Sequence, residues 1–344
     1  MALECCRESR STRVFGRKTY NKLRRATPAM RVGCAPAVSV VTQPLQSRAA
    51  LSTTAFATLL LIALMMGANH VAARFAFDAG VDVATAVLFR SAVTALVVAA
   101  LLWQARTPIR LPARQRGALL GIGLLVSAQS LCLYSAVARL PVALALLAFN
   151  TYPLWAALWA RLAYRHRAER WVLIAMPIIL AGLALALDVL GAASGLGAAA
   201  QWSSIGVGVA FAVAAGALFG LVLALTQYEA GGLDGRLRTA ATMGVVALVA
   251  LLIVIAQGGP QWPRVASGWW GLVALTLLYG TAFTILFTVL PRLGMVGNSA
   301  IMNVEPIFAL VLAWALLGQK IAPLQVIGGL IVVAAVMGLG LRRR

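Results

Sequence analysis

Apolar runs long enough to cross a bilayer dominate the chain from residue 52 onward. Each run is close to the ~20 residues that a membrane-spanning helix requires. Because lipid offers the backbone no hydrogen-bond partner, every run is predicted to be an α-helix. The predicted spans are ten in number and cover 52–76, 83–105, 116–138, 141–161, 170–189, 204–228, 238–257, 268–290, 295–317 and 323–341. The pattern therefore predicts an all-α integral membrane protein with ten transmembrane helices.

The composition supports this prediction and excludes several other classes of protein. Of the 344 residues, 62% are hydrophobic and 11% are charged, and the mean hydropathy is +0.91. Soluble domains have about 25% charged residues, so this chain has too few charges to cover a water-exposed surface. A cytosolic enzyme, a disulfide-stapled secreted domain and a coiled coil are excluded. The four cysteines form no CxxC pair and no Cys/His spacing, so no metal site is expected.

The distribution of basic residues orients the predicted helices. With the N-terminus in the cytoplasm, the inner segments hold twenty-four of the 29 lysines and arginines, and the outer loops hold only Arg139, Arg264 and Lys320. Such an excess is typical of cytoplasmic loops. We therefore expect a protein of the inner (plasma) membrane with both termini in the cytoplasm. The basic loops are interpreted as topology signals and lipid-headgroup contacts, and no nucleic-acid partner is expected.

The first 51 residues differ from the rest of the chain, because they hold ten basic residues and no apolar run of spanning length. We interpret residues 1–51 as a disordered, basic cytoplasmic extension. One alternative is a start codon assigned too early, since Met30 would also serve. A second alternative is a transit peptide, because the segment is rich in arginine and poor in acidic residues.

The chain also contains an internal repeat. A shift of 153 residues aligns the chain with itself without a gap, and it places the Asn-x-x-Pro motif at Asn150 on the one at Asn303. The predicted repeats are residues 52–191 and 204–341, with five spans each. Because five is an odd number, the second repeat must cross the membrane in the opposite direction to the first. Inverted repeats of this kind are typical of secondary transporters.

The matched prolines, Pro153 and Pro306, are predicted to kink the fourth and ninth spans. A proline inside a helix removes one N–H group and frees the carbonyl four residues earlier, here those of Phe149 and Met302. Transporters often build the solute site from such broken, symmetry-related helices. The alternative is that both prolines only shape the packing of the helices.

Several segments resemble a known family of proteins. The run Asn303–Lys320 (NVEPIFALVLAWALLGQK), followed by Pro323–Ile331 (PLQVIGGLI), is similar to the end of an EamA domain. The segments Gly67–Arg74 (GANHVAAR) and Leu88–Arg90 (LFR) add to the likeness in the first repeat. The resemblance covers about 52–341 as two tandem EamA domains of the drug/metabolite transporter (DMT) superfamily. It implies export of small metabolites, often amino acids, through a central cavity.

Glu305 is the strongest candidate for a functional residue. It lies ten residues past Met295, where the ninth span begins. This is ~15 Å along a helix, about half of a ~30 Å hydrocarbon core. A carboxylate at that depth costs several kcal/mol unless it is paired or protonated. We predict that Glu305 exchanges a proton and couples transport to the proton gradient. The alternative is a permanently paired or neutral glutamate that only holds helices together.

Three basic side chains are predicted inside the first two spans. His70 and Arg74 lie four residues apart, so both project from one face of the first span. A cationic pair on that face would suit a solute that carries a carboxylate. The alternatives are that His70 bonds a helix carbonyl and that Arg74 snorkels or pairs with Asp78. Arg90 is interpreted as a structural residue of the second span, either paired or snorkelling.

Uncharged polar and aromatic side chains of the third, fourth and ninth spans are further candidates for the solute pocket. They are Gln129, Tyr134, Asn150, Tyr152, Trp155 and Asn303. Their chemistry suits a flat or amphipathic solute. The alternative is that the asparagines and the glutamine serve as hydrogen-bond partners between helices.

The sequence contains no catalytic or nucleotide-binding motif, so neither enzyme activity nor a cofactor is predicted. The predicted function is secondary transport of a small metabolite, outward, by alternating access. Expected partners are the solute, protons and membrane lipids, and a homodimer is left open. One alternative is an uncoupled facilitator of the same fold. Another is a non-transporting membrane enzyme or scaffold, which would leave the inverted repeat unexplained.

Overall fold

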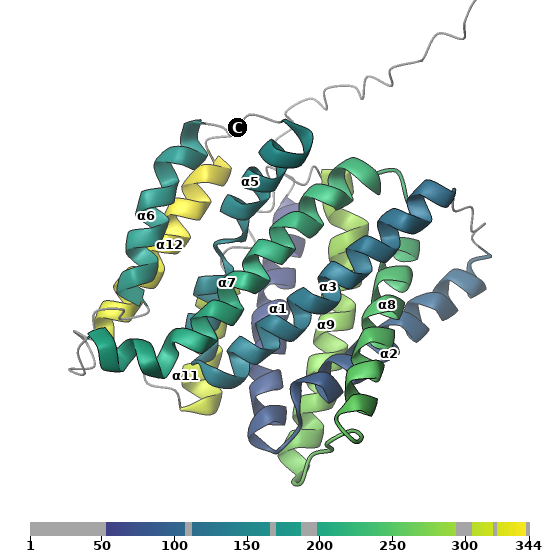
Figure 1. Ribbon diagram of the computed structural model, residues 1–344, viewed down its shortest axis with the longest axis horizontal. Helices are drawn as coiled ribbons and strands as arrows, with labels where there is room; N and C mark the ends of the chain where they lie inside the picture. Colours follow the sequence, from purple (N-terminus) through teal and green to yellow (C-terminus); the bar gives the residue numbers. More distant parts are fainter. Residues whose placement is uncertain are drawn as a thin grey trace, which may run out of the picture. The chain divides into compact units, whose positions relative to one another are not determined.

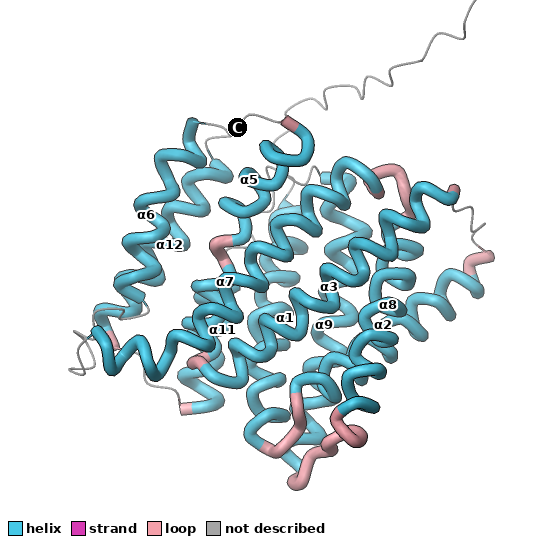
Figure 2. The backbone as a smooth tube through the Cα atoms, in the orientation of Figure 1, coloured by secondary structure: helices cyan, strands magenta, loops and turns pink. Residues whose placement is uncertain are grey.

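In the described part of the chain, all regular secondary structure is α-helix, with loops and turns between the helices and no strand (Figure 2). The structure is a computed structural model, and the residues it describes are 53–106, 112–165, 170–186, 198–293, 305–318 and 322–341. The predicted basic extension (1–51) and Asn303 lie outside these ranges, so the predictions made for them stay predictions.

The helices coincide with most of the predicted spans. The first repeat contains α1 (Thr53–Asp78), α2 (Val83–Gln104), α3 (Ala113–Arg139), α4 (Val142–Phe149), α5 (Tyr152–Tyr164) and α6 (Arg170–Ala186). The second contains α7 (Ala198–Glu229), α8 (Gly235–Ala256), α9 (Ala266–Leu293), α11 (Glu305–Leu317) and α12 (Pro323–Leu341). Seven stretches of these described ranges are helical, apolar and long enough to cross a membrane. The chain is a multi-pass membrane protein, and the count of ten spans stays a prediction.

The fourth predicted span is two helices rather than one kinked helix. Helix α4 ends at Phe149, and the Asn150 side chain donates a hydrogen bond to the Leu146 carbonyl at 2.8 Å, where the helix leaves an acceptor free. Pro153 lies in the first turn of α5, a position where its missing N–H group costs nothing. Pro306 of α11 occupies the equivalent position under the shift of 153 residues. The interruption of the fourth span thus lies just before Pro153, and the kinking roles assigned to Pro153 and Pro306 stay predictions.

The shift of 153 residues also relates helix boundaries in the structure. Applied to the first residue of α3, it gives that of α9, and applied to the last residue of α5, it gives that of α11. The packing follows the same rule, because α1 packs on α9 and α11 while α7 packs on α3 and α5. The two repeats therefore share one helical arrangement.

The repeats interlock instead of forming two separate lobes. Helix α2 packs on α8, and α6 on α12, so each of these pairs joins equivalent helices of the two repeats (Figure 1). The contacts of α1 with α9 and of α3 with α7 also cross from one repeat to the other. The centre of the helical core thus lies where the repeats meet.

Small residues permit the closest of these helix contacts. A Cβ atom built on Gly220 of α7 would lie 2.6 Å from the Ala156 nitrogen of α5, and one on Gly67 of α1 would lie 3.1 Å from the Ala309 nitrogen of α11. Gly67 and Gly220 are equivalent under the repeat shift, as are Ala156 and Ala309. Not every glycine has this role, since nothing lies within 4 Å of a Cβ built on Gly121 of α3.

We expect Gly220→Ala to lower the unfolding temperature of the detergent-solubilised protein, because the added methyl group overpacks the α5–α7 contact at a cost of about 1–3 kcal/mol. The matched control is Gly121→Ala, which adds the same methyl group in open space and gains helix propensity. Thermal unfolding of both variants beside the wild type measures the difference. Equal unfolding temperatures for the two variants would contradict the packing assigned to Gly220.

Candidate functional site

A cavity lined by both repeats lies among helices α1, α2, α3, α4, α5, α7, α9 and α11. Its polar and aromatic lining residues are His70, Arg90, Gln129, Ser130, Tyr134, Phe149, Tyr152, Phe219, Tyr279, Phe283 and Glu305. The remaining lining residues are Met66, Leu133, Leu223 and Leu286. Most of the charged and polar groups come from the first repeat, and Glu305 comes from the second.

The lining follows the internal repeat. Five pairs of lining residues are related by the shift of 153 residues: Met66 and Phe219, His70 and Leu223, Ser130 and Phe283, Leu133 and Leu286, and Tyr152 and Glu305. Equivalent positions of the two repeats thus face one space. In three of the five pairs the polar group differs between the repeats: His70 faces Leu223 in the alignment, Ser130 faces Phe283, and Tyr152 faces Glu305. The two halves of the site are therefore chemically unequal.

An acid–base pair lies in this cavity. The His70 Nε2 atom is 3.3 Å from Glu305 Oε1, and the two side chains are 2% and 9% exposed. Gly67 lies one turn before His70, and a Cβ atom there would be 3.1 Å from the Glu305 carbonyl oxygen, so the missing side chain lets α1 and α11 approach. Neither His70 Nδ1 nor Glu305 Oε1 has a hydrogen-bond partner within the described residues. Unsatisfied buried atoms of this kind leave room for a proton, a water or a solute group.

Arg90 also lies in the cavity and differs from its predicted role. Its side chain is 1% exposed, so it does not snorkel, and it forms no ion pair within the described residues. Its guanidinium carbon is 3.6 Å from the centre of the Tyr279 ring and 4.7 Å from that of Tyr134. The two rings stabilise the charge by cation–π contact, while Nε and Nη1 have no hydrogen-bond partner in the part of the chain that the structure describes.

Tyr134 connects the parts of the site. Its hydroxyl group donates a hydrogen bond to Asn69 Oδ1 at 2.9 Å, and Asn69 is fully buried. Its ring centre lies 5.6 Å from that of His70. Tyr134 therefore contacts both Arg90 and His70, the histidine of the acid–base pair.

Arg74 does not join His70 in the cavity. It lies one turn nearer the end of α1, where its Nε atom is 3.0 Å from Asp78 Oδ1. Its Nη1 atom donates hydrogen bonds to the carbonyls of Val137 and Ala138 at 3.1 and 2.9 Å. These carbonyls are at the end of α3, where a helix leaves acceptors free. His70 and Arg74 therefore do not form the expected cationic pair in the cavity. Arg74 instead connects the end of α1 to the end of α3.

Two other predicted lining residues lie outside the cavity lining. The Asn150 side chain bonds the end of α4, as described above. Trp155 packs on α7, where its Cβ would lie 2.8 Å from a Cβ atom on Gly220. Sequence reasoning found Gln129, Tyr134 and Tyr152, which do line the cavity. It missed Tyr279, because a single tyrosine in an apolar run carries no motif.

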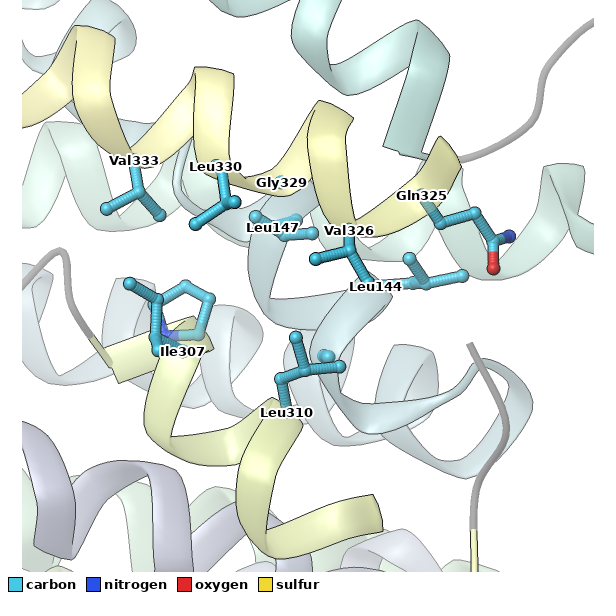
Figure 3. Close-up of a pocket in the computed structure, with 11 residues that line it drawn as sticks. Leu144, Leu147, Ile307, Leu310, Gln325, Val326, Gly329, Leu330 and Val333 are labelled. Carbon is cyan, nitrogen blue, oxygen red and sulfur yellow. The ribbon is translucent and has the colours of Figure 1, made fainter. Parts of the chain in front are cut away.

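A second pocket lies between α4, α11 and α12 and is almost entirely apolar (Figure 3). Its labelled lining is leucine, isoleucine, valine and glycine, apart from Gln325. The Gln325 side chain accepts a hydrogen bond from the Ala322 backbone at 3.0 Å, at the start of α12. No charged side chain lines this pocket, so the chemistry of the site belongs to the first cavity.

Comparison with known proteins agrees with the architecture. The model of the EamA-like transporter family matches two segments of the chain, residues 53–187 and 206–341. No curated protein is significantly similar to the chain in sequence. A solved structure described only as "Crystal structure of protein" has the same fold, with a TM-score of 0.61, 18% sequence identity, and coverage of 85% of this chain and 99% of that one.

The His70–Glu305 contact predicts energetic coupling between the two side chains. In a double-mutant cycle of His70→Gln and Glu305→Gln, the unfolding free energies should deviate from additivity by about 1–3 kcal/mol, because the two groups are buried and in contact. Denaturant titration of the protein in mixed micelles measures these free energies. The control is the exposed Arg74–Asp78 pair, where coupling of about 0.5 kcal/mol or less is expected. Additive effects at His70 and Glu305 would contradict the assigned contact.

Proposed function

The chain belongs to the EamA-like transporter family, and we propose that it is a secondary transporter that exports small metabolites, such as amino acids, by alternating access to the buried cavity. Membership of the family makes it a membrane transporter of the DMT type. The solute class, the direction and the coupling are our proposals. The observation that carries them is the buried His70–Glu305 pair at the meeting point of the two repeats.

The repeat supports alternating access. We place five spans in each repeat, with the second inverted relative to the first, in an inner membrane with both termini in the cytoplasm. Two related halves that meet around one cavity can adopt two equivalent orientations relative to each other. Rocking between these arrangements opens the cavity to one side of the membrane and then to the other.

Ion-paired clusters at the two ends of α3 are suited to act as gates. At the end of α3, Arg74 bonds to Asp78 and to the α3 carbonyls. At its start, Arg114 lies 2.9 Å from Glu229, the last residue of α7. Both clusters join helices that line the cavity, and both use polar contacts that water can replace. Each can therefore open without disrupting an apolar core.

Glu305 offers one site that a proton and the solute cannot share. Deprotonated, it accepts a hydrogen bond from an amino group of the solute or from His70. When Glu305 is protonated, it is neutral and no longer attracts the amino group of the solute. Mutual exclusion of a proton and a solute at one alternately exposed site produces exchange of one for the other. A proton that enters from outside would thus drive the solute out.

We expect efflux from proteoliposomes loaded with pooled amino acids to be faster when the outside is more acidic than the inside. Glu305→Gln should lose this response, since glutamine cannot release a proton. The control is Asp234→Asn, which changes an exposed carboxylate at the start of α8 to another good N-cap residue and should behave like the wild type.

Each other result has a definite meaning. If Glu305→Gln responds to pH as the wild type does, the coupling role of Glu305 is wrong. If wild type and variant both move solute and both ignore pH, the protein is an uncoupled facilitator. Should the wild type move no solute at all, the proposal of amino-acid export fails.

A further inference from the structure

We propose that Arg90 holds the carboxylate group of the transported solute, so that the protein selects solutes that carry a carboxylate. This inference rests on the proposed function and names the chemical class of its solute. Three observations carry it: Arg90 has no counterion among the described residues, two aromatic rings surround it, and the equivalent residue of the second repeat is uncharged.

Every acidic side chain in the described ranges has a partner other than Arg90. The partners are Arg74 for Asp78, the start of α2 for Asp82, Arg114 for Glu229, the start of α8 for Asp234 and His70 for Glu305. A buried charge without a counterion is unfavourable in a low-dielectric interior. An anion that enters the cavity would remove this penalty.

The surroundings of Arg90 hold the charge without satisfying its hydrogen bonds. The rings of Tyr134 and Tyr279 contact the guanidinium, but a ring face does not replace an oxygen acceptor for Nε and Nη1. Arg238 of α8 shows the contrast, because it is 2% exposed and its Nη1 atom donates a hydrogen bond to the Ala230 carbonyl at 3.2 Å. Of these two buried arginines, Arg238 thus has a carbonyl partner, whereas Arg90 lines the cavity.

The fold does not require a cation at this position. The shift of 153 residues places Arg90 of α2 on Met243 of α8, which is fully buried in the equivalent part of the helix bundle. The apolar residue at Met243 shows that the α2–α8 packing accepts a side chain of this size without charge. The arginine of the first repeat thus serves a need other than packing.

The guanidinium group matches a carboxylate in geometry as well as in charge. Its planar N–H groups can bond both oxygens of a carboxylate at once. Arg90 and the His70–Glu305 pair line the same cavity, and Tyr134 contacts both Arg90 and His70, so one small solute can reach both parts of the site. A solute with a carboxylate at Arg90 and an amino group at Glu305 fits this arrangement.

The test compares probes that differ in one group, using the full chain. The first set is leucine, 4-methylpentanoate, which lacks the amino group, and leucinamide, which lacks the carboxylate. The second set is phenylalanine, 3-phenylpropionate and phenylalaninamide. Binding is measured as the rise in unfolding temperature of the purified protein, and transport as competition for efflux from proteoliposomes.

We expect the wild type to prefer the four carboxylates over the two amides by about ten- to a hundredfold, as a charge-assisted hydrogen-bonded pair provides. Arg90→Met, which copies the residue of the second repeat, should lose this preference. Arg90→Lys should restore part of it, because it keeps the charge. The matched control is Arg139→Gln, which removes an exposed arginine at the end of α3 and should keep the preference.

The readouts separate failure of this inference from failure of the proposed function. Transport that treats carboxylates and amides alike, or a preference that survives in Arg90→Met, overturns the inference and leaves the transporter intact. Carboxylate-specific stabilisation that depends on Arg90, without any transport, upholds carboxylate binding at Arg90 and rejects the proposed function. Absence of both overturns both.

Stability of the ligand-free variants excludes a structural role. Removal of a buried charge that has no counterion should leave the unfolding temperature of Arg90→Met at or above that of the wild type. Arg90→Gln provides a second charge-free variant with a polar side chain. A marked fall in the unfolding temperature of both variants would identify Arg90 as a structural residue and overturn the inference.

Discussion

The interior of a membrane cannot solvate charge, and the site of this protein depends on that constraint. The side chains of His70, Arg90 and Glu305 are all buried, and all three line one cavity in a chain that is otherwise poor in charge. Each group is stable there only with a partner. The histidine and the glutamate have each other, and two tyrosine rings support the arginine. A proton or a solute that enters the cavity would therefore change the electrostatic interactions of all three groups.

Because the charged groups come from both repeats, movement of the helices would change the electrostatic interactions among them. His70, Arg90 and Tyr134 belong to the first repeat, while Glu305 and Tyr279 belong to the second. No half of the described bundle holds the site alone, so any rocking of one repeat against the other changes the distances among the charges. The close approach of α1 and α11 at a glycine keeps the carboxylate next to its histidine in the arrangement seen here. The packing of α1 on α11 thereby determines the distance between His70 and Glu305.

The sequence predicted the helices and the repeat well, because both depend on regular patterns. The predicted span 83–105 compares with α2 at Val83–Gln104, and the alignment that matched two motifs also matches helix bounds. Glu305 was found because an acidic residue within an apolar run is rare. Helical spacing predicts which face of a helix a side chain occupies, but it does not predict which residues of other helices contact that face. For this reason the separation of Arg74 from His70 and the lack of a counterion at Arg90 required the structure.

Access to the cavity from both sides of the membrane is the central claim, and thiol labelling tests it most directly. Ser130→Cys, in a chain whose four native cysteines are replaced by serine, puts a thiol on the cavity lining. In vesicles of known orientation, a membrane-impermeant maleimide should label this thiol from either side, with added solute or a pH gradient favouring one side over the other. Leu252→Cys, exposed on the outer surface of α8 where lipid surrounds the bundle, should stay unlabelled. Labelling of Ser130→Cys from one side only, under every condition, would contradict alternating access.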